Sequence, residues 1–403
     1  MVLRQAKITE EGLAALRAKI GRPLRPRTIW NRTSGYDSVN HFCIGIGDDN
    51  PLWVDEAYGK GSVIGCNLAP PSFYYSITMT VVQLGLPGVH GFQVSTNWKF
   101  HRPVRHDQRI GLITWMDAVD ELPSKMAGRK VAVRFSTVFF DAARTVLAHA
   151  RSTTYRMERG ESRERNLQGS RFEPATWNEE QLKALEEAYA AESVRGAAPR
   201  WWDDVSVGDT LPPVHKGPLC MSDMIAFYAG AMVAPTPAHG LALKDRARHP
   251  NWWFRNPENG GLEPIIRVHE NIAAAQAAGV PAPYDVGVQR QSWLIQLITN
   301  WMGDAAFLVA NDASYTAFNY FGDLTTFTGE VVRKYVENGV HLVDLAVRGA
   351  NQRGTVSIPG TATVALPARA GSAAPVCDFD RGRIALADYL AGLPNAPAPD
   401  TIK

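Results

Sequence analysis

The chain has 403 residues, a formal net charge of +2 and 20% charged residues. At the usual ~100 to 200 residues per domain, this length favours two modules over one. The balanced charge gives no electrostatic basis for binding nucleic acid or an anionic membrane. Cys43, Cys66, Cys220 and Cys377 lack the spacing of a metal site or a disulfide framework. With no apolar signal segment and no run of ~18 apolar residues, we expect a cytoplasmic protein without a bound metal.

The first part of the chain predicts one buried helix followed by strands. Residues 9–20 have the spacing of a short amphipathic helix, and residues 72–84 have the length and end signals of a buried helix. Four segments rich in Val, Thr and aromatic residues then alternate as strands do. They are residues 92–100, 109–119, 130–140 and 145–157. This order predicts an α+β module over residues 1–157.

The same order of elements returns later in the chain. Residues 158–200 are polar and are expected to form a linker with an exposed helix at 177–192. Within residues 201–367, helices are expected at 222–230 and 290–302, and strands at 307–318, 324–335, 340–347 and 355–366. A repeat at roughly 200 residues predicts two homologous halves. Residues 368–403, rich in Ala, Pro and Gly, are expected to be a surface extension.

A seven-residue run in the first half reads Gly-Asp-Asp-Asn-Pro-Leu-Trp, from Gly47 to Trp53. It resembles the Gly-Asp-x-Asn-Pro-x-His loop of MaoC-type (R)-specific enoyl-CoA hydratases. Hydration of an acyl thioester needs groups that take a proton from water and deliver one to the alpha carbon. Asp48 is present, but Trp53 replaces the His, and an indole N–H cannot exchange a proton near neutral pH. The alternative is that Asp48, Asn50 and Pro51 only form a tight turn.

In the second half, the segment 267–287 resembles the family's stretch from the catalytic His to the glycine that opens the core helix. The resemblance makes His269 the catalytic histidine and Gly287 the donor to the enolate oxygen at a helix N-terminus. The position of the matching Asp holds Pro264, so Asp285 or Glu263 is the nearest substitute.

Each of these residues has a structural alternative. His269 is alternatively a structural histidine. Asp285 is alternatively a helix N-cap or the salt-bridge partner of Arg290, and Gly287 a glycine required by packing. We take Trp53, Asn50 and Arg290 as candidate substrate-binding residues.

Two further features bear on the ligand. An insertion over residues 234–262 contains Trp252, Trp253 and Phe254, which indicate a bulky or ring-bearing acyl group or simply cover the core. Four basic residues either meet coenzyme A phosphates or form charged surface. They are Arg102, Arg105, Arg333 and Lys334.

Over residues 28–367 the chain resembles a double-hotdog MaoC-family dehydratase whose N-terminal half is similar to the fatty-acid-synthase-type dehydratase module. The resemblance implies an α+β fold of two tandem hotdog domains, each a long helix wrapped by an antiparallel sheet, with the two sheets joined edge to edge. It also implies a hydro-lyase acting on acyl-CoA, without a cofactor, as a homodimer or with a MaoC-type partner subunit.

In this interpretation His269 is the general acid/base, and Asp48 marks a degenerate half that binds the acyl or pantetheine portion. Two other hypotheses remain open: a catalytically silent acyl-CoA-binding subunit of a MaoC-type complex, and a hotdog thioesterase. Equivalent loops of a pseudo-dimer are related by an approximate two-fold axis. We therefore expect that Asp48 and His269 do not form one dyad.

Overall fold

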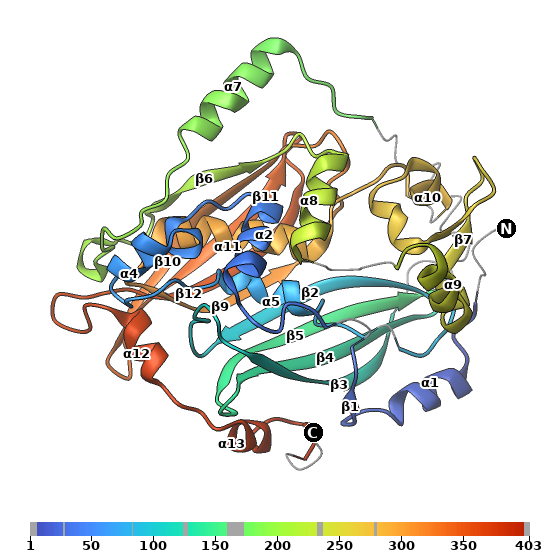
Figure 1. The fold of residues 1–403 in the computed structure, drawn as a ribbon, viewed down its shortest axis with the longest axis horizontal. Helices are drawn as coiled ribbons and strands as arrows, with labels where there is room; N and C mark the ends of the chain where they lie inside the picture. Colours follow the sequence, from blue (N-terminus) through green and yellow to red (C-terminus); the bar gives the residue numbers. More distant parts are fainter. Residues whose placement is uncertain are drawn as a thin grey trace.

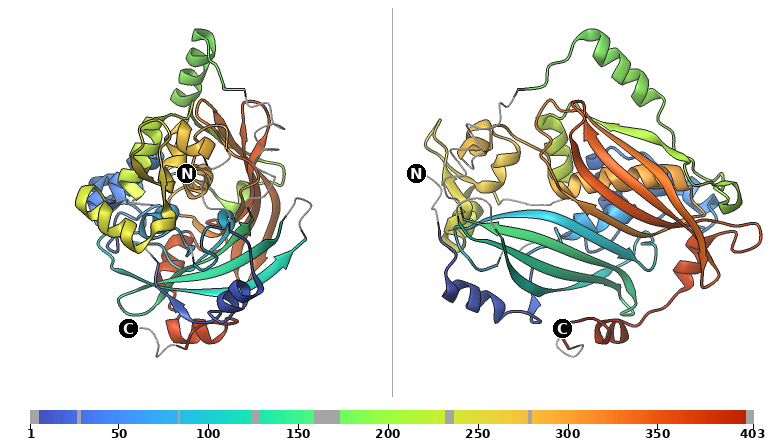
Figure 2. Two further views of the ribbon diagram at one scale, coloured as in Figure 1. Left: turned by 90° about the vertical axis from the view of Figure 1, so that its right-hand side faces the viewer. Right: turned by 180° about the vertical axis from the view of Figure 1, so that it is seen from behind.

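The computed structural model describes residues 6–26, 29–82, 84–123, 128–158, 173–231, 237–277 and 280–398. Ten strands form one antiparallel sheet in the order β1-β3-β4-β5-β2-β9-β12-β11-β10-β6 (Figures 1 and 2). The strands of the first half are β1 (Pro23–Leu24), β2 (His90–Phe100), β3 (Ile110–Leu122), β4 (Lys130–Asp141) and β5 (Val146–Met157). Those of the second half are β6 (Thr210–Lys216), β9 (Phe307–Ser314), β10 (Thr325–Glu337), β11 (Val340–Asn351) and β12 (Val356–Ala365). All eight predicted strands are confirmed.

The two halves meet where β2 pairs with β9. The register of this pair runs from Ser95 opposite Ser314 to Lys99 opposite Ala310. The two sheets therefore join edge to edge, as the resemblance implies, and the chain has the α+β double-hotdog fold.

The second half contains the long core helix, α11 (Gly287–Met302). It contacts five strands of its own half, and it also contacts α2 (Tyr36–Ile46) of the first half. Every side chain from Val288 to Met302 is buried. The helix is therefore buried on all sides although several of its residues are polar, and this confirms the core helix predicted at residues 290–302.

The long helix predicted at residues 72–84 is wrong. The chain forms only a 3-10 turn, η1 (Pro71–Phe73), and one turn of α-helix, α5 (Tyr74–Ile77), before Thr78 becomes extended. Residues after Ile77 are mainly β-branched, which lowers helix propensity. The Thr80 hydroxyl instead lies 2.7 Å from that of Ser152 on β5. Among the described residues, therefore, only those of the second half form a long central helix.

Two equivalent helices pack closely across the halves, α2 and α8 (Met221–Ala231). A Cβ atom on Gly45 would lie 2.7 Å from the Ala226 carbonyl oxygen, and one on Gly230 would overlap the His41 carbonyl. The absence of both Cβ atoms allows the two backbones to touch, which fixes the start of the Asp48 loop against the second half.

The linker and the insertion carry mostly short elements. In the linker, α7 (Glu179–Ala190) begins with an Asn178 capping box and lies on the outside of the molecule (Figure 1), as predicted. The N-terminal helix α1 (Glu10–Arg17) is also confirmed, with Thr9 as its N-cap. Residues 159–172 of the linker and 234–236 of the insertion lie outside the described residues. The insertion and the segment after it contain α9 (His239–Arg248), η3 (Pro250–Trp252), β7 (Trp253–Arg255), β8 (Leu262–Pro264), η4 (Ile265–His269) and α10 (Ile272–Ala277).

The C-terminal segment is more than the surface extension that we predicted. It forms α12 (Pro375–Arg381) and α13 (Leu386–Ala391). Leu386 and Leu390 are buried against Trp115 and Val138 of the first half. Figure 1 shows the chain leaving the second half and returning beneath the strands of the first. The tail packs against the first half through these two leucines, which are spaced as on one face of a helix within an Ala- and Pro-rich segment. In the described ranges, no helix is long and apolar enough to cross a membrane.

Candidate active sites in the two halves

The Asp48 loop begins where α2 ends. Gly47 adopts a left-handed conformation with φ 63°, which ends the helix. Asn50 then caps the short helix α3 (Pro51–Val54) by accepting a hydrogen bond from the Leu52 N–H at 3.0 Å. The loop is therefore a turn, as the alternative interpretation requires, and Asn50 has a local structural role.

Asp48 is buried and its two oxygens both accept hydrogen bonds. One accepts from the Asn50 N–H at 3.2 Å and the other from Trp53 Nε1 at 3.3 Å. Burial raises the pKa of Asp48 to about 6, although these hydrogen bonds and nearby Lys216 lower it. Trp53 therefore occupies the histidine position and restrains the carboxylate without being able to relay a proton.

The second half holds this loop in place. Lys216 Nζ donates to the carbonyl oxygens of Ile46 at 3.1 Å and Gly47 at 2.7 Å. From α11, Gln296 Nε2 donates to the Gly47 carbonyl at 2.9 Å, and Trp293 Nε1 donates to that of Ile46 at 3.0 Å. The sequence did not predict these contacts, because they join residues 169 to 249 positions apart and leave no local pattern.

A small cavity lies beside the loop. Its volume is about 40 Å³, and Asn50, Trp53, Pro71 and Arg102 are among the residues that line it. A single water needs at least ~10 to 15 Å³. The cavity, called here the N-terminal cavity, holds a few waters at most and is closed to an acyl thioester in this conformation.

His269 lies at the end of η4, beside the start of α11. Its Nδ1 is 2.8 Å from the Tyr284 carbonyl oxygen, and its ring makes an edge contact with the Tyr284 ring. Because a carbonyl only accepts hydrogen bonds, Nδ1 carries the proton and Nε2 presents a lone pair. Burial lowers the pKa of His269, which favours the neutral ring. The site thus contains an imidazole with the tautomer of a general base.

Asp285 does not orient this histidine through a hydrogen bond. It is buried and paired bidentately with Arg290, whose Nε lies 2.7 Å from Oδ2. Asn319 Nδ2 donates to the same Oδ2 at 3.3 Å, and Arg290 also donates to the carbonyls of Ala317 and Ser357. The salt bridge that we gave as the alternative role of Asp285 is therefore present, and it occupies Arg290 as well. Glu263, the other expected substitute, accepts from the Asn256 side chain instead.

Gly287 is the first residue of α11, and the Tyr284–Val286 segment that leads to it also carries the carbonyl that binds His269. The first N–H groups of a helix have no intrahelical acceptor and carry partial positive charge. A Cβ on Gly287 would lie 3.3 Å from the Tyr315 ring. A glycine at this position leaves room for the Tyr315 ring, and its N–H group is available as a donor at the helix N-terminus.

The spacing of the two sites is the same. Pro71 follows Trp53 by 18 residues, as Gly287 follows His269. Fifteen residues after each ring, Leu68 pairs with Arg105, and Tyr284 pairs with Tyr320, in isolated antiparallel bridges. Pro71 has no N–H, so the first half lacks both the imidazole and the N–H donor at these positions.

Asp48 and His269 are not hydrogen-bonded to each other. The Asp48 loop contacts α11 at Trp293 and Gln296, whereas His269 lies next to the residues that precede Gly287. Nine residues of helix separate Gly287 from Gln296, which corresponds to about 13 Å. Asp48 and His269 thus do not form one hydrogen-bonded dyad, as expected.

A groove of about 440 Å³ runs along the insertion next to η4. Trp253 and Leu262 line its apolar part, and Arg267 and Glu270, which form an ion pair, line its polar part. Phe254 is instead buried in a cluster with Tyr284. Of the insertion's aromatic residues, Trp253 thus faces the groove and Phe254 fills the core. Within the described part of the chain, no three His, Cys, Asp or Glu side chains are grouped to hold a metal ion.

Known proteins share this fold. A model of the FAS1-like dehydratase domain region matches residues 21–143. A protein described as MaoC-like dehydratase superposes with a TM-score of 0.57 at 14% identity, over 87% of this chain and 99% of that one. A MaoC domain protein dehydratase, described as putative, from Chloroflexus aurantiacus J-10-fl gives 0.52 at 12% identity, over 86% and 94%. At these identities the likeness shows the fold, a double hotdog that the chain shares with proteins described as MaoC-like dehydratases.

The curated relatives match a shorter stretch. A UPF0336 protein of Streptomyces griseus is 32% identical over 117 residues, which are 26% of this chain and 72% of that protein. For the UPF0336 protein of Streptomyces avermitilis, the identity is 29% over 98 residues, and the match spans 63% of its length. The chain belongs to the family of the UPF0336 proteins, and its residues 21–143 match the FAS1-like dehydratase domain region.

Proposed function

We propose that this chain is a hydro-lyase that hydrates enoyl-CoA thioesters, or in reverse dehydrates 3-hydroxyacyl-CoA thioesters, in its second half. The observation that carries the proposal is the position of a neutral His269, with a fixed tautomer, next to the N-terminus of α11. This reaction needs a base, an acid and a stabiliser of the enolate oxygen, and it needs no metal or redox cofactor.

In the proposed reaction, His269 Nε2 takes a proton from water while the water oxygen bonds to the beta carbon. Negative charge moves onto the thioester oxygen, where the Gly287 N–H and the helix N-terminus stabilise it. The protonated imidazole then delivers its proton to the alpha carbon. One histidine can perform both transfers in turn because the base becomes the acid. The groove beside η4 would receive a bulky acyl group against Trp253.

A second candidate function is a catalytically silent acyl-CoA-binding subunit, alone as a homodimer or with a MaoC-type partner. One observation favours it: the carboxylates at both sites are already engaged, Asp48 by Trp53 and Asp285 by Arg290. The same observation counts against a hotdog thioesterase, which would use a carboxylate as its acid or base.

A panel of enoyl-CoA thioesters of different chain length and ring content tests the three functions. Loss of the enoyl thioester absorbance without release of free thiol supports the hydro-lyase. Thiol release supports a thioesterase. Saturable binding without either change supports the silent subunit, and it removes the hydro-lyase proposal for the isolated chain.

A further inference from the structure

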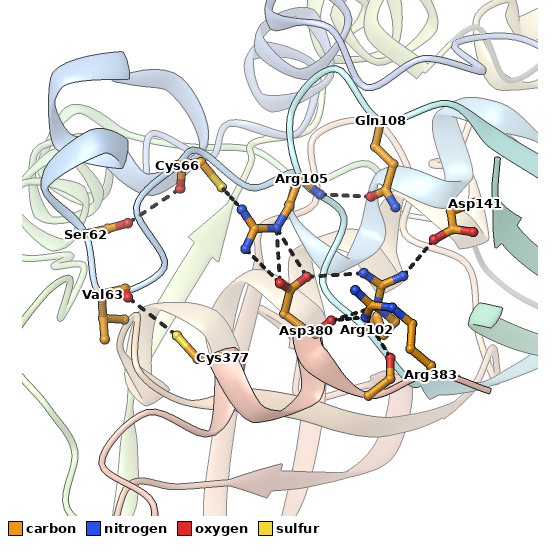
Figure 3. Close-up of polar contacts among 11 residues, drawn as sticks. Ser62, Val63, Cys66, Arg102, Arg105, Gln108, Asp141, Cys377, Asp380 and Arg383 are labelled. Carbon is orange, nitrogen blue, oxygen red and sulfur yellow. Dashed lines mark hydrogen bonds and ion pairs between the residues drawn. The ribbon is translucent and has the colours of Figure 1, made fainter. Parts of the chain in front are cut away.

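Two arginines converge on the Asp380 carboxylate, and a third binds the main chain beside it, where the C-terminal segment meets the first half (Figure 3). Asp380 of α12 accepts hydrogen bonds from Arg105 Nε at 3.2 Å and Nη2 at 2.7 Å, and its Oδ1 lies 3.5 Å from Arg102 Nη2. Arg383 donates to the Asp380 carbonyl oxygen. The two-pronged contact with Arg105 is the geometry by which arginine binds carboxylates and phosphates alike.

The charges of the cluster balance only while Asp380 is in place. Asp141 is the second carboxylate, 2.7 Å from Arg102 Nη1. The guanidinium groups of Arg102 and Arg105 thus face two carboxylates. Arg102 is buried, while the Arg105 side chain is 41% exposed, so an anion could reach Arg105 from solvent. If Asp380 withdrew, Arg102 and Arg105 would face Asp141 alone, and a phosphate group could replace the lost negative charge.

We propose that Arg102 and Arg105 form a binding site for a phosphate group, and that Asp380 occupies this site as an internal substitute. The tail helix α12 would then be an autoinhibitory segment that an incoming phosphate displaces.

The position of α12 indicates what kind of ligand carries the phosphate. Val376 of α12 lines the N-terminal cavity, as does Arg102. The Phe379 ring stacks on that of Phe307, with centroids 4.2 Å apart. Movement of α12 would remove one wall of the cavity beside the phosphate site. A phosphate on a narrow chain, as in the phosphopantetheine of coenzyme A, fits this arrangement. This choice of ligand rests on the proposed function, whereas the phosphate site itself does not.

The tail can release α12 without losing its attachment. Leu386 and Leu390 of α13 are buried separately against the sheet of the first half. Tyr389 Oη lies 3.0 Å from His101 Nε2 and 3.1 Å from His149 Nδ1. These contacts would hold the end of the tail while α12 moves.

Thermal unfolding of the full chain with increasing inorganic phosphate or coenzyme A tests the site. Asp380→Ala should lower the Tm without ligand, because Arg105 loses its carboxylate partner and Arg102 keeps only Asp141. Either ligand should then raise the Tm of Asp380→Ala more than that of the wild type. Its affinity for coenzyme A should exceed that of the wild type by about tenfold or more, the usual contribution of charged hydrogen bonds. Asp380→Asn keeps the shape of the residue and serves if Asp380→Ala does not fold.

The matched control is Asp378→Ala, on the same helix, whose partner is Arg381. With either ligand, the Tm of Asp378→Ala should rise no more than that of the wild type. The double variant Asp380→Ala/Arg105→Ala should lose the additional rise in Tm that Asp380→Ala shows. Equal responses of the Asp380 variants and the wild type would overturn the proposal. A rise in Tm with phosphate but not with coenzyme A would support the phosphate site and exclude coenzyme A as its ligand. The readout is binding, so the result does not depend on whether the chain turns over enoyl thioesters.

Discussion

The two halves contain equivalent loop segments, residues 48–71 and 264–287, which carry different side chains at the matching positions. The first half has Asp48, Trp53 and Pro71, and the second has Pro264, His269 and Gly287 at the matching steps. The first half therefore keeps the carboxylate and lacks the imidazole and the helix N–H. The second keeps the imidazole and the helix N–H and lacks the carboxylate.

The core helices also differ between the halves, and the longer helix belongs to the half that has the imidazole. The second half has 16 residues in α11, all but the first buried, whereas the first half has a 3-10 turn followed by the four residues of α5. A long helix aligns many peptide dipoles toward its N-terminus. This comparison teaches that the imidazole and the long buried helix occur together in the second half, while the first half has neither at the matching positions.

The largest expected effect concerns the buried ion pair between Arg290 and Asp285 in the second half. Arg290→Leu should lower the free energy of unfolding by about 3 to 5 kcal/mol, because Asp285 would remain buried and charged without its partner. Urea denaturation measures this loss. Arg369→Leu is the control, since its pair with Asp204 is exposed and should contribute little. An unfolding free energy unchanged by Arg290→Leu would contradict the assigned role of the pair.

His269→Ala tests which half performs the chemistry. If the chain hydrates enoyl thioesters, turnover should fall by about 100-fold or more, the usual contribution of a positioned acid/base group. A steady-state assay of kcat and KM, with circular dichroism to verify folding, makes the measurement. A folded variant with unchanged kcat would remove His269 from the mechanism.

Asp48→Asn tests the electrostatics of the first half. The pKa of Asp48 is about 6 in the folded chain, against an ordinary value of 3.8. The folded state therefore binds this proton more tightly. The stabilisation is complete below about pH 4 and is lost as the pH rises through about 6.

An Asn at position 48 cannot ionise and avoids this loss. The unfolding free energy of the variant, relative to the wild type, should rise by about 1 to 3 kcal/mol between pH 4 and pH 7.5. Asp49→Asn, at the exposed neighbour, should show no such rise. A pH-independent difference for Asp48→Asn would mean that burial does not shift this carboxyl group.

The smallest expected effect is that of Trp53→His. The substitution restores the motif, but Pro71 still supplies no N–H, and the N-terminal cavity measures only about 40 Å³. In a His269→Ala background, Trp53→His should therefore leave hydration at the level of the single variant. Recovery of turnover would show that the first half needs only an imidazole, and the comparison of the two halves would then have to be redrawn.

The sequence by itself determined the repeated strand order, the position of α11 and the two loop remnants. Strands and a long buried helix show in the spacing of apolar residues, and GDDNPLW and the segment around His269 are local patterns. The same reasoning failed at residues 72–84, where an apolar run of helical length contains β-branched residues that favour extended backbone. Length and apolarity alone did not distinguish the two conformations.

Only the tertiary structure decided how each candidate residue is used. Asp285 became the partner of Arg290, Lys216 and Gln296 came to hold the Gly47 carbonyl, and Asp380 reached Arg105 from 275 residues away. A hydrogen bond requires donor and acceptor atoms to lie within about 3 Å of each other. The separation of two residues along the chain does not show whether their atoms are this close. The sequence shows which functional groups the side chains carry. Packing determines which of these groups are already bound by other residues of the protein.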